Sequence, residues 1–143
     1  MKGKASMNNL APVLSKAEIG SISTLGLAYV GDGVYELLVR TWLLTHHHTA
    51  SLDLHRACVA VVNAPAQARA CEKITPLLSD EELAVFKRGR NAKVNQVPAH
   101  ATTAEYHTAT GLEALFGWLY VSGSTQRISE LFEIIMGDQQ SEP

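Results

Sequence analysis

The stretch LAYVGDGVYELLVR, residues 27–40, decides how the chain folds. Apolar and aromatic side chains recur in and around it every three or four residues, from Leu25 to Leu43, which is the period of one helix face. One carboxylate, Asp32, lies inside this pattern, and no lysine or arginine stands three or four positions from it. The stretch therefore predicts a long helix that carries an unneutralised acid.

Two further segments have helical patterns with a recognisable start or break. Residues 54–71 are rich in alanine, and Pro65 is expected to kink or divide this helix. Ser79 stands before three acidic residues, a pattern typical of a helix start, because the hydroxyl caps the backbone and the acids favour the first turn.

The C-terminal third contains the clearest helix signals. Thr102 and Glu105 match a capping box and predict a helix to about residue 122. Gly123 is expected to end it, and residues 124–136 to form a last amphipathic helix. Since no segment shows the period-two alternation of half-buried strands, the sequence predicts an all-α fold.

The length of 143 residues suits one domain, which we expect over residues 19–137. Residues 1–18 are expected to form a partly ordered N-terminal lead-in, and residues 138–143 a flexible tail. A hydrophobic fraction of 46% with 18% charged residues is ordinary for a globular protein. Apolar runs are too short to cross a bilayer, no secretory signal follows the N-terminus, and the two cysteines lack metal-ligand spacing. A cytoplasmic protein with reduced thiols is the simplest expectation.

A second acid, Glu113 in TGLEALFGWLY, also lacks a cation one helical turn away. Burying such a carboxylate without a partner costs several kcal/mol, so each acid needs a distant cation or a metal ion. If the two helices cross, Asp32 and Glu113 could together hold one Mg²⁺. Two alternatives stay open: Asp32 caps a helix after a Gly-Asp-Gly turn, and Glu113 faces solvent. Glu36 is either a supporting residue behind Asp32 or a solvated one.

A basic cluster lies within the sequence FKRGRNAK. We expect residues 88–100 to form an irregular loop, because glycine, two asparagines and a proline interrupt them. Cations and amides on such a loop suit phosphate groups of RNA, although a solvated charged loop is the alternative. The candidate RNA-binding residues are Lys87, Arg88, Arg90, Asn91 and Lys93.

Three motifs occur in an order that resembles one known family. Residues 27–44, LAYVGDGVYELLVRTWLL, resemble the signature helix of the ribonuclease III superfamily, and residues 109–120, ATGLEALFGWLY, look like its partner helix. The segment RGRNAK, residues 88–93, followed by residues 106–117, is closer still to Mini-ribonuclease III, the bacterial branch without a double-stranded-RNA-binding domain. The resemblance covers roughly residues 19–136 and implies a dimeric helical bundle like the ribonuclease III endonuclease domain.

The resemblance also implies roles for single residues. Asp32 matches the catalytic aspartate, and Glu113 the second metal-binding carboxylate. Full-length ribonucleases III carry two more acids where this chain has Ala28 and Thr110, so the number of metal ions stays open. Tyr29 falls where the family places an aromatic that inserts into the partner subunit, which makes it a candidate dimer anchor; the alternative is an ordinary core tyrosine.

An endoribonuclease is the activity that the resemblance implies. Mg²⁺, with Mn²⁺ as a substitute, would support hydrolysis of double-stranded RNA by a homodimer to 5′-phosphate and 3′-hydroxyl ends. The implied substrate is the stem at the ends of precursor large-subunit (23S-type) ribosomal RNA, with a ribosomal protein as an accessory partner. Two other classes remain for the residues alone: a non-catalytic RNA-binding or ribosome-associated helical dimer, and a helical protein–protein adaptor.

Overall fold

The computed structural model describes residues 8–46, 51–93 and 101–140, without the side chains of residues 51, 52 and 138–140. Within these residues the chain forms helices and no strand, which confirms the all-α prediction. None of the described helices is long and apolar enough to cross a lipid bilayer. The elements are α1 (Lys16–Gly20), α2 (Thr24–His46), α3 (Ser51–Val62), α4 (Ala64–Ile74), the 3₁₀ helix η1 (Thr75–Leu77), α5 (Asp80–Arg90), α6 (Thr103–Val121) and α7 (Thr125–Gln140).

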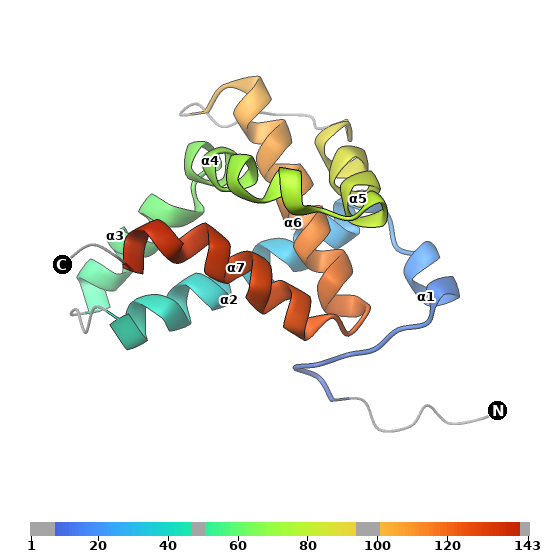
Figure 1. The fold of residues 1–143 in the computed structure, drawn as a ribbon, viewed down its shortest axis with the longest axis horizontal. Helices are drawn as coiled ribbons and strands as arrows, with labels where there is room; N and C mark the ends of the chain where they lie inside the picture. The colour runs from blue at the N-terminus through green and yellow to red at the C-terminus, as the bar shows by residue number, and fades with distance from the viewer. Residues whose placement is uncertain (1–7, 47–50, 94–100, 141–143) are drawn as a thin grey trace.

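Helix α6 is the centre of the molecule, with α2, α4, α5 and α7 packed against it (Figure 1). Nearly every α6 residue from Ala109 to Val121 is buried, as expected for a helix that is apolar on all sides. The most extensive packing joins α6 to α2. The two motif helices of the sequence are therefore direct neighbours.

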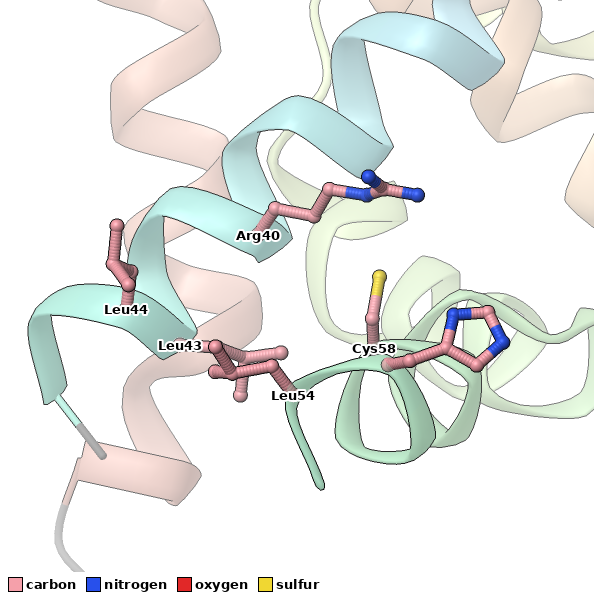
Figure 2. A pocket seen from close by; sticks show the side chains of 6 residues that line it. Arg40, Leu43, Leu44, Leu54 and Cys58 are labelled. Atoms are coloured by element: carbon pink, nitrogen blue, oxygen red, sulfur yellow. The ribbon is translucent and has the colours of Figure 1, made fainter. Parts of the chain in front are cut away.

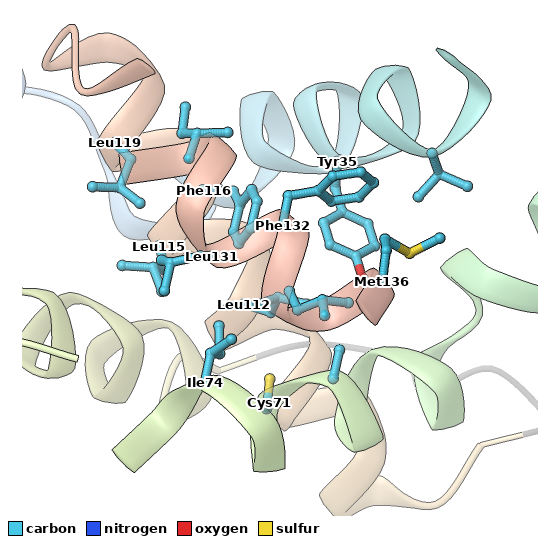
Figure 3. Close-up of a cluster of buried hydrophobic side chains, with 14 of the residues drawn as sticks. Tyr35, Cys71, Ile74, Leu112, Leu115, Phe116, Leu119, Leu131, Phe132 and Met136 are labelled. Atoms are coloured by element: carbon cyan, nitrogen blue, oxygen red, sulfur yellow. The ribbon is translucent and has the colours of Figure 1, made fainter. Parts of the chain in front are cut away.

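The main core lies between α2, α4, α6 and α7 (Figure 3). Tyr35 of α2 makes edge-to-face contacts with Phe116 of α6 and Phe132 of α7, at ring-centroid distances of 5.3 and 6.1 Å. Both cysteines, Cys58 and Cys71, are reduced and buried. They act as small apolar groups, as the sequence predicts.

Most predicted helix boundaries are confirmed. Asn63 caps α4 just before Pro65, so the alanine-rich segment is divided there. Ser79 and Thr102 each form a full capping box, with Glu82 in α5 and Glu105 in α6. The chain then turns after α6 at Gly123, whose φ of 78° lies in the left-handed region that favours glycine.

The N-terminal segment gains a short helix, and one predicted boundary in α5 is wrong. Residues 16–20 form the short helix α1 with a capping box at Ser15, and the preceding residues lie along the end of α6 through a Leu14 N–H bond to the Val121 carbonyl at 2.8 Å. The predicted loop from residue 88 is wrong for its first three residues, because α5 stays helical to Arg90. Residues 91–93 are non-helical, as predicted, and residues 94–100 of that loop lie outside the described residues.

Candidate active site

The crossing of α2 and α6 brings two backbones into contact at a pair of glycines. A Cβ atom placed on Gly31 would stand 1.6 Å from the Glu113 carbonyl oxygen and 2.7 Å from the Gly117 nitrogen. A Cβ on Gly117 would likewise overlap the carbonyl oxygen of Leu27. Any larger residue at either position would force the helices apart. Asp32 follows one glycine directly, and Glu113 lies one turn before the other, so the crossing sets the spacing of both acids.

The two candidate carboxylates meet at this crossing. The side chains of Asp32 and Glu113 lie close enough for the Asp32 charge to raise the pKa of Glu113, although 81 positions separate the two residues in the sequence (113 minus 32). Asp32 is exposed, whereas Glu113 is half-buried behind it. Among the described residues, no lysine or arginine forms an ion pair with either acid. The site is therefore a pair of acids that is open to solvent on the Asp32 side.

Both alternative interpretations of these acids are wrong. Helix α2 runs without interruption from Thr24 to His46, so residues 31–33 are not a turn and Asp32 is not a cap. Glu113 does not face solvent freely, because α2 and α4 cover its helix. The interpretation of a cap and an exposed acid on a non-catalytic scaffold depended on those two placements.

The electrostatics of Glu113 are unusual for a carboxyl group. Burial, and then the charge of Asp32 and a hydrogen bond to it, raise the pKa of Glu113 to about 8. Glu82 provides a contrast in the same fold: Arg127 donates to both of its oxygens at 2.8 and 2.9 Å, and this pair lowers the Glu82 pKa. The chain neutralises one buried acid with arginine and leaves Glu113 beside another acid.

Sequence reasoning missed Gln67 of α4: burial and Asp32 raise the pKa of Glu113, and the Gln67 amide partly opposes this effect. Its side chain is 1% exposed, and its Nε2 donates to the Val62 carbonyl at 3.0 Å. The only available signal was periodicity, since residues 67, 71 and 74 share the buried face of α4 and Gln67 is the one polar member of that set.

The two positions where full-length ribonucleases III carry further acids are closed by small side chains. Ala28 and Thr110 are 6% and 5% exposed, and the Thr110 hydroxyl donates to the Tyr106 carbonyl at 3.0 Å. In the part of the chain that is described, no cluster of three or more histidine, cysteine, aspartate or glutamate side chains could hold a metal ion. The acidic site therefore consists of two carboxylates.

Glu36 lies one turn after Asp32 and pairs with Arg40 at 3.2 Å on the helix surface. Arg40 in turn lines a hollow between α2 and α3, with Leu43, Leu44, Leu54, His55 and Cys58 (Figure 2). The charge of Glu36 is thus partly satisfied within its own helix. Its assignment as a supporting residue of the acidic site stays a prediction.

The basic cluster lies at the end of α5 and just beyond it. Gly89 packs on the α6 turn that carries Glu113, because its missing Cβ leaves room for Gly111 and Ala114. Lys87 and Arg88 flank this contact and are exposed, as are Asn91 and Lys93 after the helix. Arg90 is half-buried, and its guanidinium lies over the Phe86 ring, 5.8 Å from the centroid. The structure therefore places the candidate RNA-binding residues next to the α6 turn of the acidic site.

Tyr29 is not a core residue, because 83% of its side chain is exposed on α2. Leu25 and Leu37 of the same helix are also exposed. Leu37 also lines a groove between α2 and α7, together with other apolar residues that include Val34 and Ile128. The alternative of an ordinary buried tyrosine is therefore wrong, and the role of dimer anchor stays a prediction.

Comparison with known proteins agrees with this geometry. Residues 25–124 match the Ribonuclease III domain family. Mini-ribonuclease 3 of Thermoanaerobacter sp. strain X514 is 39% identical over 122 residues, which cover 85% of this chain and 86% of that protein. Mini-ribonuclease 3 of Symbiobacterium thermophilum is 42% identical over 113 residues, or 79% of this chain and 87% of that protein.

A solved structure has the same fold. The crystal structure of a protein from Fusobacterium nucleatum superimposes with a TM-score of 0.78 at 31% sequence identity, covering 85% of this chain and 94% of that one. The matched region contains both helices of the acidic site and the basic end of α5. The chain therefore belongs to the ribonuclease III family, within its Mini-ribonuclease 3 group, and is an endoribonuclease.

Proposed function

We propose that this endoribonuclease cleaves double-stranded RNA with a divalent metal ion held by Asp32 and Glu113. The observation that carries the proposal is the meeting of these two acids at the glycine crossing without a basic partner among the described residues. Two neighbouring carboxylate charges repel each other unless a proton or a cation lies between them. A cation resolves the repulsion at neutral pH.

The donor set fits Mg²⁺, with Mn²⁺ as a substitute. Mg²⁺ prefers oxygen ligands and often takes only one or two protein carboxylates, filling its other positions with water and substrate phosphate. The exposed side of Asp32 leaves room for those ligands. Bound there, the ion would supply an activated water and neutralise charge on the phosphate, giving 5′-phosphate and 3′-hydroxyl ends.

The residues around the acids have separate tasks in this proposal. Lys87, Arg88, Arg90, Asn91 and Lys93 would bind RNA phosphates and position the duplex, without reading its bases. Because Gly89 anchors their segment on the α6 turn of Glu113, phosphates bound there lie close to the acids. Glu36 and Arg40 would keep the following turn of α2 electrically balanced, so that no cation competes for Asp32.

We further propose a homodimer in which Tyr29 anchors the partner subunit. An 83% exposed tyrosine on α2, the helix that also lines an apolar groove with α7, supports a self-complementary contact. Each duplex strand would then meet one acidic site. We also propose that the enzyme acts in the cytoplasm on the stem at the ends of precursor 23S-type ribosomal RNA, with a ribosomal protein presenting the substrate, as the family resemblance of the sequence implies.

The test is cleavage of an end-labelled RNA duplex by purified protein in Mg²⁺, compared with Asp32→Ala and Glu113→Gln. We expect both variants to lose cleavage by at least about 1,000-fold while they still bind the duplex. Glu130→Gln, which removes an exposed acid of α7 that pairs with Arg127 rather than with the acidic site, should cleave at the wild-type rate. Wild-type cleavage by Asp32→Ala would refute the metal site.

A further inference from the structure

A small cavity lies between α3, α4 and α7, and its lining is more polar than the core beside it. Its volume is about 110 Å³, and α3 and α4 contribute mostly alanine to its wall. Three polar side chains also line it: Tyr35 of α2, with Arg69 and Lys73 of α4. In the part of the chain that the structure describes, no acidic side chain borders this cavity, and no candidate residue of the acidic site or the basic cluster does so.

The hydroxyl of Tyr35 is the buried polar group of this cavity. The side chain is 1% exposed, and the hydroxyl oxygen has no hydrogen-bond partner among the described residues. Figure 3 shows the ring reaching from α2 toward α4, with the oxygen at its far end. Burial raises the pKa of Tyr35, so the hydroxyl keeps its proton and is a donor at neutral pH. A phenylalanine would make the same contacts with Phe116 and Phe132 without an unpaired buried donor, so the hydroxyl is suited to an acceptor inside the cavity.

Two cations of α4, one helical turn apart, stand at the same cavity. Lys73 donates to the Ile135 carbonyl oxygen of α7 at 3.0 Å, which holds its ammonium group at the cavity wall. Arg69 is exposed and forms no ion pair with any other described residue. A guanidinium group presents several N–H donors in one plane, a geometry that matches the oxygens of an oxyanion. Donors from three side chains, without a carboxylate, favour an anion over a metal ion.

We propose that this cavity binds one tetrahedral oxyanion, inorganic phosphate or sulfate, through the Tyr35 hydroxyl, the Arg69 guanidinium and the charge of Lys73. A volume of about 110 Å³ admits such an ion, whereas organic ligands occupy pockets of about 300–1,000 Å³. The bound ion links α2 to α4 beside the Lys73 contact with α7, and it stabilises the folded chain as its occupancy rises. Because none of these three residues belongs to the acidic site, the inference does not depend on the proposed metal ion.

The test is calorimetric titration of the full chain with inorganic phosphate in buffer that contains EDTA, together with melting curves. The wild type should bind one phosphate per chain, and sulfate should compete. Tyr35→Phe removes only the hydroxyl and Arg69→Gln removes an exposed cation, so both variants should fold. Each should weaken phosphate binding about 10- to 100-fold, the usual effect of one hydrogen bond to a charged group. Phosphate at about ten times its dissociation constant should raise the wild-type melting temperature by about 4–6 °C, and that of either variant by less.

The matched control is Arg56→Gln, which removes an exposed arginine of α3 that does not line the cavity. This variant should bind phosphate as the wild type does. The inference is wrong if the wild type shows no saturable phosphate binding, or if either Tyr35→Phe or Arg69→Gln keeps the wild-type affinity. An equal loss in Arg56→Gln would also overturn it, because net charge alone would then attract the ion. If binding is lost instead when Lys87 and Arg88 are replaced by alanine, the ion belongs to the proposed RNA-binding surface and the cavity is not its site.

Discussion

Substitution of Gly31 by alanine tests whether the glycine crossing builds the site. The new Cβ would stand 1.6 Å from the Glu113 carbonyl oxygen, while real Cβ atoms keep at least 3.0 Å, so the backbones must separate by about 1.4 Å. Overpacking of this kind costs about 1–3 kcal/mol, and the backbone on both sides leaves no flexible side chain to yield. The gain of about 1 kcal/mol in helix propensity offsets part of this cost. Since no flexible neighbour can yield, the cost lies in the upper part of that range, at about 2–3 kcal/mol, and the expected net loss of stability is about 1–2 kcal/mol.

The effect on activity should exceed the effect on stability. A metal site tolerates ligand shifts of only about 0.2 Å, and a misplacement of about 1 Å can cost 100-fold in rate. We expect the melting temperature of Gly31→Ala to fall by about 3–8 °C and its cleavage rate in Mg²⁺ to fall at least about 100-fold.

The control is Gly137→Ala in α7, where an added Cβ would meet nothing within 4 Å. This variant should be as stable as the wild type or slightly more so, and should cleave the duplex normally. Wild-type melting and cleavage by Gly31→Ala would show that the backbone contact does not set the spacing of the acids.

Three further predictions concern charge, assembly and RNA binding. Because burial and the neighbouring acid raise the pKa of Glu113 from 4.5 to about 8, the folded protein keeps a proton that the unfolded chain releases. In metal-free buffer the free energy of unfolding, measured by urea titration, should therefore fall by up to about 5 kcal/mol as pH rises from about 4.5 to 8, and Glu113→Gln should remove this loss. Parallel pH profiles of the wild type and Glu113→Gln would contradict this prediction. Tyr29→Ala should sediment as a monomer, and the melting temperature of this monomer should stay at the wild-type value, whereas Leu77→Ala, a control at another exposed apolar residue, should remain a dimer. A Tyr29→Ala variant that still sediments as a dimer would contradict the role of Tyr29 as an anchor. Replacing Lys87 and Arg88 by alanine should reduce the slope of log affinity for duplex RNA against log salt by about 1–2, and an unchanged slope would place the RNA elsewhere.

Local patterns predict much of this fold because they act within a few residues. Helix caps at Ser79 and Thr102 use side chains and backbone amides only three positions apart, so the sequence contains the whole interaction. Pro65 divides its helix for an equally local reason. The error at Gly89 is instructive: glycine commonly interrupts helices, but here it lets α5 approach α6.

The site depends more on tertiary contacts. The sequence shows that no lysine or arginine stands one helical turn from Asp32 or Glu113, which indicates that both acids need a distant cation or a shared metal ion. The two acids meet because Gly31 and Gly117 let α2 and α6 cross closely, and this contact is apparent only in the folded structure. Gln67 was missed because a single glutamine in an alanine-rich helix usually faces water, and its hydrogen bond to Val62 and its effect on the Glu113 pKa exist only in the folded chain.

A crystal of the protein grown with Mn²⁺, measured at an X-ray wavelength where manganese scatters anomalously, tests the central claim most directly. The account predicts one strong anomalous peak per subunit within about 2.0–2.4 Å of a carboxylate oxygen of both Asp32 and Glu113, with waters in the remaining positions. A peak bound by other residues, or full Mn²⁺ occupancy at this position in Glu113→Gln, would contradict it.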